Sequence, residues 1–159
     1  MKPFVGIIGH SSSGKSTIIQ SLTGCPKRTG IQFVEDEKTG REILVIASSP
    51  QEDKVSNENF LNELKAAARR KATTGAVVAM RPSNGTKRLK MESMVEEAEK
   101  LGFGLRLYVL DPPRSSAKRT ADLAEIKRRL PGHELTLLDA RRFAHLNSAQ
   151  IAKAASLLH

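Results

Sequence analysis

Short runs of consecutive apolar residues alternate along the chain with longer segments in which apolar residues recur every third or fourth position. A run of roughly four to eight apolar residues is typical of a buried strand, and the wider spacing is typical of a helix with one buried face. These patterns predict strands at 4–9, 30–36, 41–48, 75–80, 105–110 and 134–138. They predict helices at 16–24, 57–71, 91–101, 116–130 and 147–158. Strands and helices therefore alternate, apart from one pair of neighbouring strands.

The two neighbouring strands, 30–36 and 41–48, are joined by a short polar segment in which Gly40 is the expected turn residue, so we expect an antiparallel hairpin. The other strands are connected through helices, and such crossovers produce a parallel sheet with helices on both faces. With 159 residues, the chain is long enough for one domain with a full core and too short for two typical ones. The predicted fold is a three-layer α/β fold with a mostly parallel sheet, formed by a single domain over residues 1–159.

Helix ends are marked by residues with known preferences. Gly24 and Gly102 are expected to end the first and third helices, because glycine readily adopts the left-handed conformation found there. The last helix is expected to begin at Asn147, because Gln150 follows three residues later as in a capping box.

Residues 9–17, which read GHSSSGKST, lie between the first predicted strand and the first predicted helix. Gly9, Gly14, Lys15 and Ser16 match the pattern G-x-x-x-x-G-K-[ST], the phosphate-binding loop or Walker A motif. We expect both glycines to adopt backbone conformations closed to other residues, so that consecutive N–H groups converge on a β-phosphate. The positive end of the following helix adds to this field. The motif therefore predicts nucleotide binding at the carboxyl end of the first strand.

The side chains of this loop have separate expected roles. Lys15 should reach the β- and γ-phosphates and take part in catalysis, with its ammonium exposed to the ligand rather than buried in the core. The Ser16 hydroxyl is the expected Mg²⁺ ligand, and Thr17 should lie near the α-phosphate. The other residues expected to surround the phosphates are His10, Ser11, Ser12 and Ser13.

Two segments resemble the Ras-like small GTPase family, in its translation-factor-related class. GHSSSGKSTIIQSLTG is similar to the family's first motif and first helix, and KTGREILVIASSPQ is similar to its second and third strands. The likeness in element order covers nearly the whole chain. It implies a P-loop NTPase fold of Ras-like order, GTP or ATP and Mg²⁺ as cofactors, and a regulatory role exerted through a protein partner.

The family's third motif, D-x-x-G, falls on Ala47 to Pro50. An alanine thus replaces the acidic residue that holds the magnesium water, and a proline, which has no N–H to donate, replaces the glycine that senses the γ-phosphate. Nucleotide hydrolysis is therefore expected to be slow or absent. Glu52 and Asp53 are the nearest carboxylates that could replace the magnesium contact. Thr29 is the candidate for the switch threonine that closes on magnesium in the family.

The family's guanine-reading motif, N-K-x-D, falls near residues 110–116, where Asp111 supplies a carboxylate but no Asn-Lys pair precedes it. Further on, LDARRF resembles the family's S-A-K segment, with Asp139, Ala140 and Arg141 in those places. The resemblance implies that Asp111, Asp139 and Ala140 contact the base. Because the motif is incomplete, we expect weak discrimination between GTP and ATP.

The charge of the chain allows a second class of function. The net charge is +9 and the pI is near 10.0, which favours anionic partners such as nucleotide, nucleic acid or acidic protein surfaces. The basic residues are spread over several helices, aromatic residues make up 4% of the chain and tryptophan is absent. A stacking platform for single strands is therefore missing, and a nucleic-acid or acidic-protein binding module with an unused loop is not favoured.

A third possibility is a small kinase that transfers the γ-phosphate of ATP to a nucleoside or another small acceptor. Residues 111–119, DPPRSSAKR, have the composition of an arginine-rich lid, but the hairpin after the first helix argues against this class.

The first residues, MKPFVGII, run directly into the loop and leave no room for a signal sequence. No run of about eighteen apolar residues occurs, so we expect a cytoplasmic protein without a membrane span.

Overall fold

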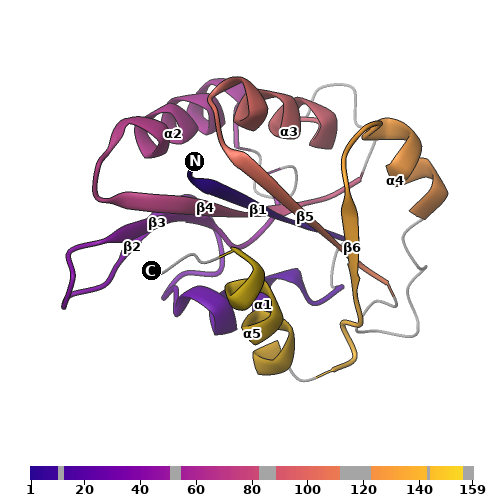
Figure 1. Cartoon of the computed structure of the whole chain (residues 1–159), viewed down its shortest axis with the longest axis horizontal. Helices are drawn as coiled ribbons and strands as arrows, with labels where there is room; N and C mark the ends of the chain where they lie inside the picture. Colours follow the sequence, from indigo (N-terminus) through magenta and orange to yellow (C-terminus); the bar gives the residue numbers. More distant parts are fainter. Residues whose placement is uncertain (11–12, 51–54, 83–88, 112–122, 143, 156–159) are drawn as a thin grey trace.

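The structure is a computed structural model that describes residues 1–10, 13–50, 55–82, 89–111, 123–142 and 144–155. Strands and helices alternate in it as the sequence predicts (Figure 1). The strands are β1 (Pro3–Ile8), β2 (Gln32–Glu35), β3 (Glu42–Ile46), β4 (Thr73–Met80), β5 (Gly104–Leu110) and β6 (Leu135–Leu138). The helices are α1 (Lys15–Thr23), α2 (Asn57–Arg69), α3 (Met91–Lys100), α4 (Leu123–Arg129) and α5 (Ala144–Ala155).

The strands form one sheet in the order β2-β3-β4-β1-β5-β6. Only the β2–β3 pair is antiparallel among these strands, which confirms the predicted hairpin in a mostly parallel sheet. Helices α2 and α3 cover one face, and α1 and α5 cover the other (Figure 1). The three-layer α/β prediction is therefore confirmed. Strand β4 lies between β1 and β3, a neighbour relation that the order of elements along the chain does not predict.

The central strand β1 shows how the two faces are built. Phe4 and Ile8 belong to the core beneath α2 and α3, whereas Val5 and Ile7 belong to the core beneath α1 and α5. This alternation is the two-residue period of a strand buried on both sides. Gly6 permits the close packing, since a Cβ there would lie 2.4 Å from the Met80 Cε atom. β1 pairs with β4 on one side and β5 on the other, so its carboxyl end lies in the middle of the sheet.

The outer helices form where local signals and burial agree. In α2, the Ser56 hydroxyl accepts a hydrogen bond from the Asn59 N–H at 3.1 Å, and Phe60 and Leu64 are buried.

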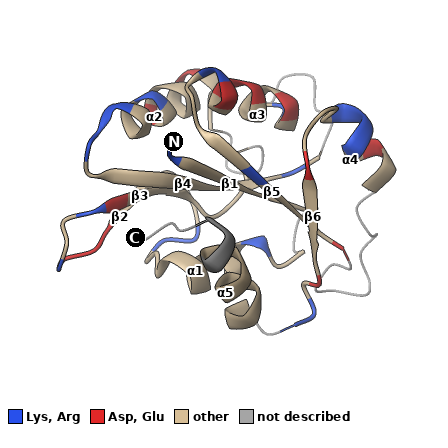
Figure 2. Ribbon diagram, in the orientation of Figure 1, with Lys and Arg blue, Asp and Glu red and all other residues tan. Residues whose placement is uncertain are grey.

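The fourth helix was predicted to begin at residue 116. Residues 112–122 lie outside the described part of the chain, and the described part of α4 begins at Leu123. Lys and Arg lie in several separate places, including the end of α2 and α4, while α3 carries many acidic residues (Figure 2).

The predicted start of the last helix is wrong. α5 begins at Ala144, so Asn147 lies inside the helix rather than at its cap. The Asn147 side chain is fully buried and donates a hydrogen bond from Nδ2 to the Asp139 backbone oxygen at 2.9 Å. This tertiary hydrogen bond uses the side chain that the capping box assigned to the helix end. Helix α5 then packs against α1, where the Ser21 and Ser148 hydroxyls lie 3.0 Å apart.

None of the helices in the described part of the chain has the length and apolar character needed to cross a bilayer.

Candidate functional site

The predicted phosphate-binding loop follows β1 at the carboxyl end of the parallel strands. The Gly9 N–H donates a hydrogen bond to the Met80 backbone oxygen at 3.1 Å, which attaches the start of the loop to the end of β4. The Ser13 N–H donates to the His10 oxygen at 3.2 Å, so the loop turns back on itself before α1 begins. The loop therefore lies at the sheet edge where ligands bind in open α/β folds.

The two motif glycines are required for different reasons. Gly14, the residue before α1, has φ 106 and ψ 7, a conformation that side-chain-bearing residues rarely adopt. Gly9 is not one of the described glycines with a positive φ. The prediction that it adopts a backbone conformation closed to other residues is therefore wrong. It is required for space instead, because a Cβ at Gly9 would lie 2.4 Å from the Ser13 Oγ atom.

Lys15 lies across the loop. Its Nζ atom donates hydrogen bonds to the backbone oxygens of Gly9 and His10, both at 2.7 Å, and the residue is only 4% exposed. The expectation that its ammonium stands free toward a ligand is therefore wrong. Because charge-assisted hydrogen bonds are stronger than neutral ones, the side chain also holds the loop in shape. Its positive charge is nevertheless placed at the loop, where a phosphate group would bind.

The first turn of α1 completes the positive field. Gly14 is the N-cap residue of α1 and has no side chain to cap the helix, and no acidic residue lies in the first turn. Backbone N–H groups at a helix N-terminus and the helix dipole together favour an anion. The Ser13 hydroxyl is buried and has no hydrogen-bond partner among the described residues. Ser11 and Ser12 lie outside those residues.

The residues predicted to hold magnesium are only partly brought together. The Ser16 hydroxyl donates a hydrogen bond to the Ala47 backbone oxygen at 2.9 Å, which leaves the lone pairs of its oxygen available to a metal ion. Ala47 thus lies beside Ser16, where the family resemblance places a carboxylate. Thr29 is exposed, and no contact between described residues joins it to Ser16. Residues 51–54, which include Glu52 and Asp53, are outside the described residues.

No group of three histidine, cysteine, aspartate or glutamate side chains in the described ranges is arranged to hold a metal ion. One hydroxyl fits Mg²⁺, which commonly keeps several waters and binds through few protein ligands together with substrate phosphates. The residues present are therefore compatible with a metal ion carried mainly by a bound nucleotide.

The segment between β6 and α5 forms a tight turn around Asp139. The Asp139 Oδ1 atom accepts hydrogen bonds from the Arg141 backbone N–H at 2.9 Å and from its Nε at 3.1 Å. The Oδ2 atom accepts one from the Arg141 Nη2 at 3.1 Å. The hydrogen bonds from Arg141 hold the pKa of the Asp139 carboxyl below its usual value, and the same carboxylate raises the pKa of Arg141. The carboxylate is thus directed toward Arg141.

A pocket of about 210 Å³ joins this turn to the phosphate-binding loop. The residues that line it come from the loop, the start of α1 and the turn before α5: Gly14, Thr17, Ile18, Ala140, Arg141, Arg142 and Ala144. Three of the predicted binding residues, Gly14, Thr17 and Ala140, therefore lie around one cavity. Asp111 and Asp139 are not among the lining residues. Their contact with a base stays a prediction.

Asp111 has a structural role at the end of β5. Its backbone N–H donates a hydrogen bond to the Leu138 oxygen at 3.0 Å, which ties the end of β5 to the end of β6. Its side chain is half-buried. Residues 112–122, which include most of the predicted lid, lie outside the described part of the chain.

The binding residues predicted from the sequence end at Ala140, although Arg141 occupies the last place of the compared S-A-K segment, and Arg142 was not considered. Both line the pocket beside the loop. The available signal was the pair of consecutive arginines directly after Asp139 and Ala140 in a segment already compared with a base-contacting motif. The Asp139–Arg141 hydrogen bonds could not be inferred from it, because they depend on the backbone turn at residue 140.

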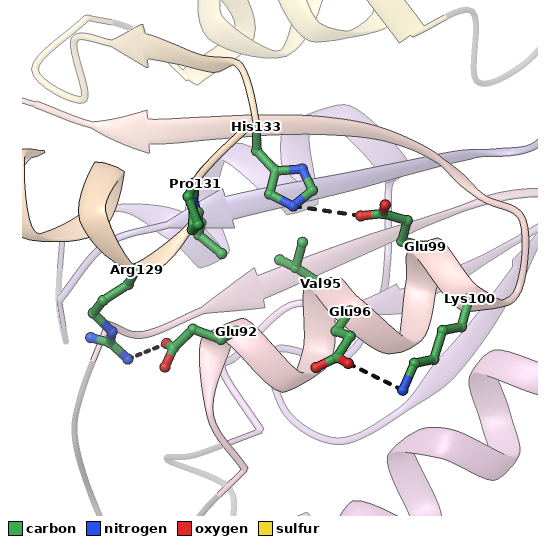
Figure 3. A pocket seen from close by; sticks show the side chains of 9 residues that line it. Glu92, Val95, Glu96, Glu99, Lys100, Arg129, Pro131 and His133 are labelled. Carbon is green, nitrogen blue, oxygen red and sulfur yellow. Dashed lines mark hydrogen bonds and ion pairs between the residues drawn. The ribbon is translucent and has the colours of Figure 1, made fainter.

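A larger pocket, of about 530 Å³, lies between α3 and the end of α4, away from the loop (Figure 3). Arg129 at one end forms an ion pair with Glu92 and donates a hydrogen bond to the Pro82 oxygen at 2.7 Å. At the other end, the His133 Nε2 atom lies 3.5 Å from the Glu99 carboxylate (Figure 3). Val95 lies between the two pairs and is almost fully buried. These contacts fasten α4 and the start of β6 to α3.

Comparison of the sequence with protein-family models and with curated proteins found no match. The fold is similar to that of a de novo designed protein with a P-loop NTPase fold, solved by solution NMR. The TM-score is 0.52 at 18% sequence identity, over 100% of this chain and 96% of the other. The FeoB G-domain from Methanococcus jannaschii gives a TM-score of 0.46 at 20% identity, over 98% of this chain and 99% of that domain. A sugar kinase from a Janibacter species gives 0.47 at 16% identity, over 99% and 96% of the two chains. The chain has a P-loop NTPase fold.

Proposed function

We propose that this protein binds a nucleoside triphosphate through the loop at residues 9–17. The observation that carries the proposal is the position of Lys15, whose ammonium is held over the loop by the backbone oxygens of Gly9 and His10 at 2.7 Å. It lies at the uncapped N-terminus of α1, where Gly14 has φ 106. A buried cation beside a helix N-terminus is an arrangement that binds phosphate groups. The P-loop NTPase fold supports the same function.

The phosphate chain would follow the loop, with the sugar and base extending toward the pocket beside α1. Thr17 and Ile18 line this pocket together with residues of the turn before α5. One nucleotide can therefore contact both the loop and the turn. Magnesium, when bound with the nucleotide, would be held by the Ser16 hydroxyl and would neutralise charge on the phosphates.

We also propose that hydrolysis is slow and that the protein acts as a small G-protein-like regulator rather than as a rapid enzyme. Ala47 supplies only a backbone oxygen to Ser16, at 2.9 Å, where the Ras-like resemblance would place a carboxylate. Phosphoryl transfer depends on groups that position water and stabilise charge. Their replacement by Ala47 and Pro50 favours a binding function whose output passes to a protein partner.

Equilibrium titration calorimetry of the full chain with GTP and ATP, with Mg²⁺ in excess, tests the binding proposal. We expect saturable binding of at least one triphosphate, with a Kd below about 100 μM, which is the order expected when several phosphate contacts act together. Ser16→Ala keeps the loop lysine and should weaken binding in Mg²⁺ more than in EDTA. Absence of saturable binding up to millimolar nucleotide, by a protein that remains folded by circular dichroism, would overturn the proposal.

A further inference from the structure

The side chain of Arg129, the last residue of α4, is a largely buried cation that joins three elements. It is only 11% exposed. Its Nη1 atom donates a hydrogen bond at 2.7 Å to the backbone oxygen of Pro82, just beyond β4. Its Nη2 atom donates to the carboxylate of Glu92, in the first turn of α3 (Figure 3). Because the donors of a guanidinium are fixed in one plane, this side chain sets the position of Pro82 relative to α3.

The end of β4 is bonded in turn to the phosphate-binding loop. Pro82 lies two residues after Met80, whose backbone oxygen accepts a hydrogen bond from the Gly9 N–H at 3.1 Å. The Gly9 backbone oxygen then accepts a hydrogen bond from the Lys15 Nζ atom at 2.7 Å. Met80 is fully buried, and close-packed interiors transmit strain rather than absorb it. A continuous path of backbone and hydrogen bonds therefore leads from Arg129 to the lysine of the loop.

We propose that Arg129 is a positioning residue for the phosphate-binding loop. By holding Pro82, it fixes the end of β4, and through Met80 it fixes the Gly9 peptide whose oxygen orients Lys15. Contiguous hydrogen bonds and rigid elements are the means by which distant groups are energetically coupled. This inference rests on the proposed nucleotide-binding function and deepens it, because it adds a residue of α4, outside the motif, on which phosphate affinity depends.

Glu92 is the second anchor of this guanidinium. Its carboxylate holds Arg129 from the side of α3, while Nη1 of Arg129 faces the Pro82 oxygen. A buried cation is costly unless it is paired, so the ion pair keeps the guanidinium in place. Glu92→Gln retains an oxygen that can accept the hydrogen bond but removes the charge. We therefore expect a smaller effect from Glu92→Gln than from the loss of Arg129 itself.

A side chain that only stabilises the fold would behave differently. Arg129→Ala would then lower the free energy of unfolding, but the molecules that remain folded would bind phosphate as before. Removal of a positive charge can also weaken anion binding from a distance. Arg128 is the matched control for this effect, since it lies on the same helix, carries the same charge and has a side chain that is 77% exposed.

The first measurement is calorimetry of the full chain with ATP and with inorganic tripolyphosphate, in excess Mg²⁺ and where circular dichroism shows every variant folded. In Arg129→Ala we expect both ligands to lose affinity by about threefold to tenfold, against less than about twofold in Arg128→Ala. Arg129→Lys keeps a donor for one of the two partners, so it should recover part of the loss. Glu92→Gln should weaken both ligands by about twofold.

The second measurement is amide hydrogen exchange, which follows the same path without a ligand. The Gly9 N–H bonds to the Met80 oxygen after the end of β1, and the Gly104 N–H bonds to the Lys2 oxygen at 2.8 Å before its start. In Arg129→Ala we expect the Gly9 amide to exchange at least about fivefold faster while the Gly104 amide is nearly unchanged. The Gly104 amide is the control, since a general loss of stability would accelerate both.

Three results would overturn the inference and leave nucleotide binding intact. These are wild-type affinity in folded Arg129→Ala, equal losses of affinity in Arg128→Ala and Arg129→Ala, or equal acceleration of exchange at Gly9 and Gly104. If Arg129→Ala does not fold, wild-type affinity in both Arg129→Lys and Glu92→Gln overturns it. If neither ligand binds to the wild-type protein, the proposed function itself is wrong and this inference falls with it.

Discussion

The phosphate-binding loop and the turn before α5 border one pocket, but they are shaped by different parts of the chain. The loop is shaped mainly by backbone: Gly14 at φ 106, Gly9 packed against Ser13, and Lys15 bound to two carbonyl oxygens. The turn is shaped mainly by a side chain, the Asp139 carboxylate, which accepts three hydrogen bonds from Arg141. Glycine and lysine in a backbone motif are readable from sequence, whereas a side-chain pair becomes visible only in three dimensions.

The largest expected effect concerns the rate of nucleotide hydrolysis, which tests whether the loop is a binding site alone or part of a complete catalytic site. We expect the isolated protein to hydrolyse GTP or ATP at less than about one turnover per minute, far below the typical enzymatic median of roughly 10 s⁻¹. The loop offers binding groups, but Ala47 beside Ser16 offers no carboxylate. Phosphate release with Mg²⁺ in excess measures the rate. Rapid turnover that disappears in Glu52→Gln or Asp53→Asn would show that the loop forms a complete catalytic site.

The next largest effect is expected from Lys15→Ala. Loss of the charged hydrogen bonds to phosphate should lower triphosphate affinity by about tenfold to a hundredfold, with GTP, ATP and tripolyphosphate affected alike. This equality is expected because the three ligands share a phosphate chain, and inorganic tripolyphosphate has no base. Calorimetry supplies the affinities, and Lys71→Ala, an exposed lysine after α2, is the control. Unequal losses among the three ligands would show that Lys15 does more than bind the phosphate chain.

The two loop glycines provide a smaller and separate test. Gly9→Ala should destabilise the fold by about 1–3 kcal/mol through the clash with Ser13, and Ser13→Ala should recover part of that loss. Gly14→Ala should cost about 1–2 kcal/mol through backbone strain, with no recovery from Ser13→Ala. Urea unfolding of the single and double variants measures these free energies. Equal recovery for both glycines would show that crowding, rather than conformation, decides the loop at Gly14.

The smallest effect is a shift in the titration of Asp139. Its pKa is lowered from 3.8 by the hydrogen bonds to Arg141, so the ionised carboxylate is the form that the folded turn favours. A depressed pKa contributes stability that is present above the unfolded value and is lost as the pH falls through the folded value. Carboxyl NMR should therefore show a midpoint below the ordinary one, restored to it in Arg141→Ala. An ordinary midpoint in the wild-type protein would mean that the pair is open in solution.

The same contrast explains how much could be predicted from sequence. The hydrophobic pattern gave the order of strands and helices, because each element must bury its own apolar face. The position of β4 between β1 and β3 was not predictable, since a crossover can place the next parallel strand at more than one position in the sheet. Asn147 illustrates a local signal overridden by a tertiary one: it resembled a cap, but it is buried and bonded to Asp139.

At the site, Gly14 and Thr17 from the motif and Ala140 from the compared segment line one pocket, and their contact with a nucleotide stays a prediction. The motif did not predict the burial of Lys15, because it describes which residues meet a phosphate and not how they are held without one. The segment comparison included Arg141, but it did not predict the hydrogen bonds between Arg141 and Asp139, since these form only after residues 139–142 have turned.

The central position of β1 also has a consequence for how the protein is made. Residues 3–8 pair with residues 76–80 of β4 and residues 104–109 of β5, all of them far along the chain. During synthesis the ribosome releases β1 and the loop long before their partners exist, and contacts between distant segments form slowly. β1 must therefore wait until both of these later strands have been made, so the phosphate-binding loop takes its shape late, although its sequence precedes those of its partner strands.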